Sequence, residues 1–396
     1  MVEPGWQPMP GTPAPVEVAA AKSRPPEAGF VVGDTAFASP TAGWAYVVDL
    51  EAAQCRVLFT QDAGATWRPQ LAWRGLFYGR LTAFDERRAA FALAVSQGDD
   101  INGYRPEPHA ADDPFVGPDA FLAGTEDAGV SWTLAQAPVN GFGAGFLTPG
   151  QMWLRAYVHQ QSGMPGMART DLVRTWDGGA TWHSLAGVKG SGVVDVTFQS
   201  ATDGLLVAAE GNGANVLYRT VDAGVSWEPE ALEPPPRLPV NAERRIEPVM
   251  GRDGTVLLVL SALSGRDAAR RPKWEGRYVY RRVGSRDWAG PYRLPMVPVR
   301  SRRPHPAAWG ADGRIWTAAG HDLFVADDPA GPWQRRHLRL PAKQLITRID
   351  PVAGGTVWLT TNNAFKIPGA APGGHLYRSV DDGASWDYVP IDSAIR

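Results

Sequence analysis

An eight-residue pattern, [ST]-x-D-x-G-x-[ST]-W, occurs five times along this chain of 396 residues. An aspartate at its third position can accept backbone N–H bonds across a tight turn, and a glycine at its fifth position tolerates the positive φ that such a turn needs. A short apolar segment precedes each copy. The pattern therefore predicts five copies of one turn, each closed by a tryptophan. The copies begin at Thr60, Thr125, Thr175, Thr220 and Ser379.

Two further segments, 246–288 and 308–333, have the same apolar segments and closing tryptophan but lack the full pattern. The seven units are about 53 residues apart, slightly longer than the usual propeller repeat. Alternating apolar residues and frequent turns, with Gly 44 and Pro 35, favour strands throughout. We predict an all-β fold: a single seven-bladed β-propeller of four-stranded antiparallel blades over residues 28–396, preceded by a Pro/Ala-rich tether over 1–27. The closing tryptophans are Trp67, Trp132, Trp182, Trp227, Trp288, Trp333 and Trp386.

The repeated pattern resembles the Asp-box, or bacterial neuraminidase repeat, of sialidases, xyloglucanases and sortilin-type receptors. In blade style the chain is most similar to the photosystem II stability and assembly factors, whose units also join a Gly-Trp strand to this box. The resemblance implies that each box lies between the third and fourth strands of a blade, and that its aspartate has a structural role. It also implies a non-enzymatic binding or assembly protein. The box aspartates are Asp62, Asp127, Asp177, Asp222 and Asp381.

Composition excludes several classes of function. Lys+Arg 39 against Asp+Glu 41 leaves a net charge of −2, so no overall positive field attracts nucleic acid. The single cysteine, Cys55, rules out a disulfide framework and a cysteine-rich zinc site. The most apolar stretch, 255–263, is far shorter than the roughly 20 residues of a membrane span. No signal peptide is recognisable, yet we expect an exported protein, extracellular or periplasmic, with a cytoplasmic location as the alternative.

Long insertions between the predicted strands mark one face of the propeller as the binding face. We expect a protein or glycan ligand there. The first insertion carries Asp99, Asp100, Asp112 and Asp113, which could bind calcium but lack the spacing of a calcium loop. Its alternative is a solvated loop, and no other cofactor is expected. The insertions span residues 96–115, 159–168, 264–276 and 362–374.

The strand expected to line the central channel of each blade carries charged residues. Channel residues are often polar because the channel is wet, which is one interpretation. The other is a site in which arginines hold an anionic group while a carboxylate or histidine transfers protons. The candidates for catalysis are Asp195, Glu247, Asp350 and His305, and those for ligand binding are Asp34, Arg80, Arg245, Arg303 and Arg348.

Two functions follow from these observations. We favour a non-catalytic binding or assembly propeller, with basic residues on the connections between blades that could dock an acidic partner. The alternative is a carbohydrate-active enzyme, a glycoside hydrolase or a polysaccharide lyase. Sialidase activity is disfavoured because the Arg-Ile-Pro triplet of that family is absent. The basic residues are Arg244, Arg245, Arg300, Arg302, Arg303, Arg335 and Arg336.

Overall fold

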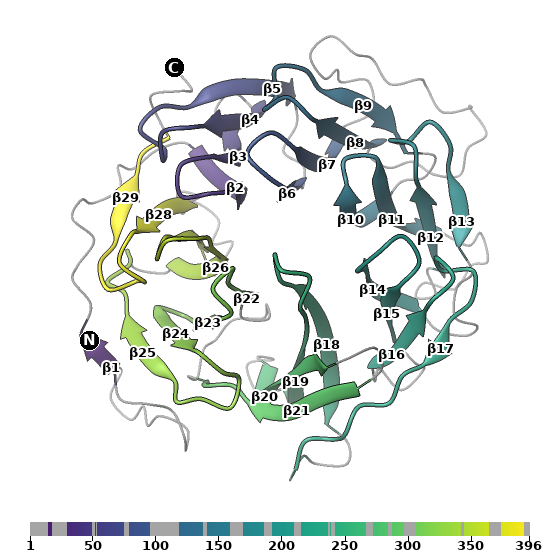
Figure 1. Ribbon diagram of the computed structural model, residues 1–396, viewed down its shortest axis with the longest axis vertical. Helices are drawn as coiled ribbons and strands as arrows, with labels where there is room; N and C mark the ends of the chain where they lie inside the picture. Colours follow the sequence, from purple (N-terminus) through teal and green to yellow (C-terminus); the bar gives the residue numbers. More distant parts are fainter. Residues whose placement is uncertain are drawn as a thin grey trace. The chain divides into compact units, whose positions relative to one another are not determined.

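The computed structural model is built from β-strands, and its described residues form no helix. Figure 1 shows the strands coloured along the chain. The structure describes residues 15–17, 30–49, 52, 54–74, 79–95, 119–137, 141–158, 169–185, 192–209, 215–236, 238, 242–266, 272–283, 287–296, 306–341, 344–363 and 374–391. The described strands make seven antiparallel sheets of four consecutive strands, one of which gains a fifth strand. This order confirms the predicted seven-bladed β-propeller class.

The chain divides into two compact units. One comprises Glu27–Gly211, Val216–Glu230 and Pro390–Arg396 and holds the first four blades. These are β2 (Phe30–Phe37), β3 (Gly43–Asp49), β4 (Gln54–Thr60) and β5 (Arg68–Arg74); β6 (Gly79–Ala83), β7 (Ala89–Val95), β8 (Asp119–Thr125) and β9 (Thr133–Gln136); β10 (Gly141–Thr148), β11 (Gln151–Val158), β12 (Arg169–Thr175) and β13 (His183–Leu185); β14 (Gly192–Phe198), β15 (Gly204–Ala209), β16 (Asn215–Thr220) and β17 (Glu228–Pro229).

The second unit comprises Met1–Pro26, Asn212–Asn215 and Ala231–Val389 and holds the last three blades. These are β18 (Glu243–Met250), β19 (Val256–Arg266), β20 (Pro272–Val283) and β21 (Asp287–Arg293); β22 (Ala307–Trp309), β23 (Ile315–Ala319), β24 (Asp322–Ala326) and β25 (Gln334–His337); β26 (Gln344–Pro351), β27 (Val357–Asn363), β28 (His375–Ser379) and β29 (Asp387–Val389).

A short strand, β1 (Pro15–Glu17), lies within the segment that the sequence predicts to be a tether. It pairs in parallel with β25, the fourth strand of the sixth blade, and places Glu17 opposite His337. Sequence patterning cannot find this strand, because three residues in a Pro/Ala-rich context carry no period-2 signal. The sixth blade therefore has five strands instead of the predicted four.

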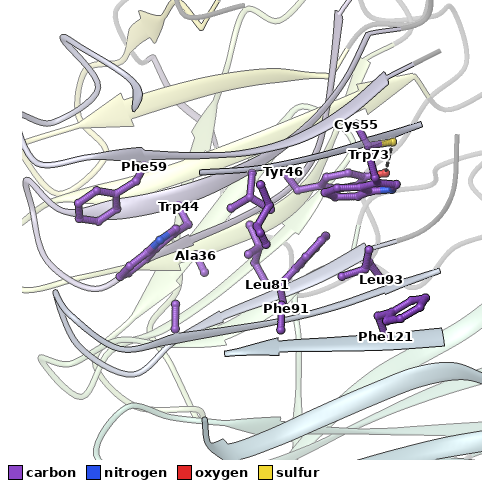
Figure 2. Packing of buried hydrophobic residues seen from close by; sticks show 14 of the residues in the cluster. Ala36, Trp44, Tyr46, Cys55, Phe59, Trp73, Leu81, Phe91, Leu93 and Phe121 are labelled. Atoms are coloured by element: carbon purple, nitrogen blue, oxygen red, sulfur yellow. Dashed lines mark hydrogen bonds between the residues drawn. The ribbon is translucent and has the colours of Figure 1, made fainter. Parts of the chain in front are cut away.

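Aromatic side chains fill the space between the first and second blades (Figure 2). Tyr46 of β3 stacks on Trp73 of β5, with ring centroids 5.6 Å apart, and its ring also meets Phe91 of β7 at 5.3 Å. The Tyr46 hydroxyl lies 3.4 Å from the buried Cys55 sulfur, and burial raises the pKa of this hydroxyl. Buried aromatic rings each remove a large apolar area from water, so this packing stabilises the contact between the two blades.

The repeated turn lies between the third and fourth strands of five blades and is built alike in each. In the first, Asp62 Oδ1 accepts bonds from the Thr60 hydroxyl and from the Thr66 N–H, both at 2.8 Å, while Oδ2 accepts the Thr66 hydroxyl. Gly64 has φ 82°, a left-handed conformation that glycine adopts at little cost, and its N–H donates to the Thr60 hydroxyl. The same bonds recur at Asp127, Asp177, Asp222 and Asp381.

These turns also pack against the preceding blade. Carbonyl oxygen Ala128 O of the second turn accepts bonds from Gln70 Nε2 at 2.6 Å and Arg68 Nη2 at 3.1 Å, both on β5. A Cβ added at Gly179 or Gly224 would clash with Ala135 or Leu185 on the fourth strand of the blade before it. Each of these glycines therefore permits both the turn and the close approach of its neighbour.

Candidate functional site

Five of the predicted site residues share one register position on the first strands of their blades. In six blades, the first and second strands end at a residue pair whose two members have the same separation in sequence. In the first blade this pair is Phe37↔Gly43. The residue three positions before that pair is charged in five of the six, among the residues that the structure describes. Those residues are Asp34, Arg80, Asp195, Glu247 and Arg348; in the sixth blade Pro306, which directly precedes β22, takes the position.

A register shift precedes three of these residues. The pairing of β2 with β3 shifts between Val32 and Asp34, that of β14 with β15 between Val193 and Asp195, and that of β26 with β27 between Ile346 and Arg348. A β-bulge turns the following side chain in a new direction and is common beside functional sites. The fold therefore sets these positions apart from the regular alternation of their strands.

In the four-blade unit, Asp195 is the most unusual of these carboxyl groups. Its side chain is half-buried on β14, and its Oδ1 accepts the N–H of Val196 at 2.8 Å. Burial raises the pKa of this carboxyl above its ordinary value, although the positive charges of Arg80 and Arg155 act in the opposite direction. The structure therefore brings the predicted residues Asp195 and Arg80 within electrostatic range of each other. Arg155 on β11 joins them.

Asp34 connects two blades. Its Oδ2 accepts the N–H of Leu81 on β6 at 2.8 Å, so the carboxylate completes a backbone hydrogen bond between the first and second blades. Such a bond satisfies a backbone donor and makes Asp34 part of the framework. Arg80 lies next to Leu81 in the chain and is exposed, so its guanidinium is accessible to a ligand.

In the three-blade unit, Arg348 and Asp350 form an ion pair on β26. Arg348 Nε lies 3.1 Å from each oxygen of the Asp350 carboxylate, whose side chain is 12% exposed. Arg252 in the turn between β18 and β19 completes this group: burial lowers its pKa, Asp350 acts to raise it, and Arg348 acts to lower it. Two guanidinium groups therefore act on one carboxylate in this unit.

Glu247 and Arg245 of β18 have separate partners. Arg245 Nε donates to Glu243 two residues earlier at 2.8 Å, a half-exposed surface pair. Glu247 acts to raise the pKa of the fully buried Arg277 on β20, which burial lowers to about 10. Arg277 Nη1 also donates to the Thr317 hydroxyl at 3.0 Å. These contacts join the fifth and sixth blades within their unit.

In contrast to Asp195, the aspartates of the repeated turns have lowered pKa values. Hydrogen bonds from the Ser or Thr four residues later lower the pKa of Asp127, Asp177 and Asp222 to about 2. The pKa values of Asp62 and Asp381 are also lowered. Carboxylates held ionised by several donors are poor proton donors or acceptors near neutral pH. Their geometry is that of a turn.

Several predictions fall outside the described residues. These are His305, Arg303, Arg300, Arg302, the acidic residues Asp99, Asp100, Asp112 and Asp113, the insertions 96–115 and 159–168, and most of 362–374. Among the residues that the structure does describe, no group of three or more His, Cys, Asp or Glu side chains is arranged to hold a metal ion. The described part of the chain also contains no helix long and apolar enough to span a membrane.

Two expectations about loops were wrong. The insertion at 264–276 is largely a β-ribbon, because β19 runs to Arg266 and β20 begins at Pro272. Arg244, Arg245, Arg335 and Arg336 lie on strands β18 and β25, not on connections between blades. Arg335 is buried, with Nη2 3.0 Å from Asp322 Oδ2, because a neighbouring carboxylate satisfies its charge. Sequence alone cannot show such a pairing.

Three functional candidates were missed by sequence reasoning: Arg155, Arg252 and Arg277. Arg155 lies on a second strand and Arg252 in a turn, so neither lies on a first strand, where the charged candidates were expected. Arg277 follows the predicted insertion directly. In each case the signal would have been a charged residue within or beside a mainly apolar strand, which marks a paired or functional group more often than a solvated one.

No protein-family model matches the chain, and no curated protein matches it significantly. Among solved structures, the chain is similar to YCF48 bound to D1 peptide, with a TM-score of 0.50, 16% identity, and coverage of 88% of this chain and 97% of that chain. It is also similar to the BP39L lectin from Burkholderia pseudomallei, with a TM-score of 0.52, 14% identity, and coverage of 91% and 97%.

A third similar structure is a prolyl endopeptidase, with a TM-score of 0.52 and 11% identity; the match covers 91% of this chain and 50% of that one. At these identities the shared property is the fold. The predicted resemblance to propellers of the photosystem II assembly-factor type is therefore confirmed as a likeness in fold.

Proposed function

We propose that this protein is a non-catalytic binding or assembly propeller that presents charged first-strand residues to a protein or glycan ligand. The observation that carries the proposal is the state of the candidate carboxylates. Asp34 accepts a backbone N–H from the next blade, and Asp350 is paired with Arg348. Carboxylates fixed in this way support a binding surface, whereas glycoside hydrolysis commonly needs two carboxyl groups of different pKa across one bond.

The similar folds support the same proposal. One of them is seen with a bound peptide and another is a lectin, so propellers of this class serve both kinds of recognition. Arg80 is the residue expected to make the main contact in the four-blade unit, because it is exposed and lies in the field of Asp195. A guanidinium suits this role because its fork of donors can bind a carboxylate with two parallel hydrogen bonds.

The test is a screen of the full chain on peptide and glycan arrays, followed by titration of each hit. Arg80→Ala is expected to weaken binding about tenfold or more. Arg88→Ala is the matched control, since Arg88 lies in the same blade but bonds the exposed Asp85 in a surface turn. Equal binding by both variants and the unaltered protein would show that the first-strand residues are not the binding surface.

A second function has one observation in its favour. A carboxyl group of raised pKa, like that of Asp195, can remain protonated and act as a general acid in a carbohydrate-active enzyme. Release of reducing ends or unsaturated products from a panel of polysaccharides and sialosides tests this alternative. Product that disappears in Asp195→Asn but persists in Asp85→Asn would replace the binding proposal with an enzymatic one.

A further inference from the structure

Two histidines meet in the sixth blade, beside the buried pair of Asp322 and Arg335. His321 lies in the turn between β23 and β24, and His337 is the last residue of β25. Their ring centroids are 6.2 Å apart, and the ring planes are inclined by 35°. The sequence separates them by sixteen residues, and it is the pairing of β24 with β25 that brings them together.

One nitrogen of His337 is anchored to a buried carboxylate. His337 Nδ1 lies 2.9 Å from Asp322 Oδ1, and Asp322 is also its register partner across the sheet. The other carboxylate oxygen accepts Arg335 Nη2 at 3.0 Å. The side chains of Asp322 and Arg335 are 9% and 8% exposed, whereas that of His337 is 51% exposed. The anchored Nδ1 thus faces the protein while the ring opens to solvent.

His321 is anchored in the same manner. Its ring bonds the backbone of Gln344, and because this bond favours the charged imidazole, the ring is the donor and the carbonyl the acceptor. A neutral imidazole that donates from one nitrogen has a lone pair on the other.

This arrangement is the one that metal-binding histidines use. A ligating histidine usually donates its second ring nitrogen to a carboxylate or a backbone carbonyl, which fixes the tautomer and the ring orientation. With metal–nitrogen bonds of about 2.0–2.1 Å, two imidazoles on a tetrahedral ion have centroids roughly 5 Å apart. The observed 6.2 Å is within about 1 Å of that value.

We propose that His321 and His337 chelate a divalent transition-metal ion that prefers imidazole, such as Zn²⁺ or Cu²⁺, while Asp322 and the Gln344 carbonyl orient the two rings. Since no group of three or more protein ligands occurs among the described residues, water completes the coordination. The ion would link the β23–β24 turn to β25, the strand that also pairs with β1. This site is independent of the proposed binding function.

The first test is calorimetric titration of the chelator-treated full chain with Zn²⁺. The unaltered protein is expected to bind one ion that His337→Gln and His321→Ala each bind at least about tenfold more weakly. Glutamine keeps an N–H donor for Asp322, so the loss reports coordination and not folding. The control is His183→Ala, an exposed histidine whose ring packs against Trp176 instead. Affinity unchanged in both site variants, or weaker than about 1 mM in the unaltered protein, would overturn the proposal.

The second test identifies the ligands directly. Electron paramagnetic resonance of the chain loaded with one equivalent of Cu²⁺ should show couplings to two imidazole nitrogens, and His337→Gln should retain one. Asp322→Asn is expected to lower affinity about 10–100-fold through the orientation of His337, while leaving both couplings at saturating copper. A two-nitrogen signal that persists in His337→Gln would place the ion elsewhere.

Discussion

Aspartates in two regions of this protein have opposite properties. In the repeated turns, hydrogen bonds from Ser226 and Thr220 lower the pKa of Asp222 to about 2, although the side chain is close to the surface. On the first strand β14, Asp195 accepts the N–H of Val196 but is half-buried, and its pKa is raised. The same residue type thus has a lowered pKa in one place and a raised pKa in the other.

The difference shows that donor number and burial, rather than residue type, set the direction in which the pKa of a carboxyl group shifts. A turn aspartate has donors on both oxygens within five residues of sequence. A first-strand carboxylate depends on groups from other strands, such as Arg80 and Arg155 near Asp195. Turn aspartates can therefore be identified locally, whereas the first-strand residues require the fold.

The largest effect on the free energy of unfolding is expected at Arg277, a buried charge near the first-strand residue Glu247. Arg277→Ala removes a fully buried guanidinium that bonds Thr317 and lies in the field of Glu247. Leaving buried polar groups without their partner should lower the free energy of unfolding by about 3 kcal/mol or more. Arg277→Met, which keeps the packing volume and removes the charge, should cost much less. Urea unfolding of both variants measures this, and equal losses would show that volume, not charge, is decisive.

A smaller loss is expected from the turns, whose bonds are local. Thr220→Val removes a buried hydroxyl that donates to Asp222 at 2.7 Å and accepts the Gly224 N–H at 2.9 Å. The free energy of unfolding should fall by about 2 kcal/mol, because the Gly224 donor is left buried and unsatisfied. Thr202→Val, at an exposed turn position in the same blade, should change it little. Matching losses in the two variants would contradict a specific role for the turn hydroxyl.

The pH dependence of stability should separate the two regions by sign. The pKa of Asp222 is lower in the folded chain than in the unfolded one, so its contribution is present above about pH 4 and is lost as the pH falls toward 2. The pKa of Asp195 is raised, so its contribution is greatest below about pH 4 and falls as the pH rises through the folded pKa.

Denaturant unfolding over a pH series checks this sign. Asp222→Asn should flatten the stability curve on the acid side, between about pH 2 and 4, while Asp195→Asn should flatten it above about pH 4. An Asp195→Asn curve that parallels the unaltered protein above pH 4 would mean that this carboxyl is an ordinary surface group.

The smallest effect is expected at a charge that belongs to neither region. Arg88 bonds Asp85 at 2.6 Å in the turn between β6 and β7, with side chains 48% and 45% exposed. Exposed pairs contribute little because solvent screens them, so Arg88→Ala should change the free energy of unfolding by less than about 0.5 kcal/mol. Chemical denaturation at low and at high salt measures it. A loss above about 1 kcal/mol at high salt would show that surface pairs in this protein matter as much as the turns.

Sequence reasoning succeeded where interactions are local and failed where they are not. The period of the closing tryptophans was sufficient to predict seven blades, because each blade is one repeat of the chain. The ribbon of β19 and β20 was mistaken for a loop, since its basic residues hide the alternation of a strand. Strand β1 was missed because its pairing partner, β25, lies more than three hundred residues away.

The candidate site divides in the same way. Residues such as Asp195, Glu247 and Arg348 were found from sequence because they follow a repeating position on the first strands. Their partners Arg155, Arg277 and Arg252 were not, because electrostatic range is a property of the fold. The histidine pair was also missed: the seven histidines look scattered in the sequence until β24 pairs with β25.

By itself, then, the sequence of this protein determined its architecture. Eight-residue turns and short strands are specified by neighbours in the chain, and their repetition specifies the class of fold. The tertiary structure alone decided which charges are buried, which carboxylates are paired, and that His321 and His337 share one edge. The physical reason is that desolvation and Coulomb interactions depend on everything within a few ångströms, and most of those neighbours are distant in sequence.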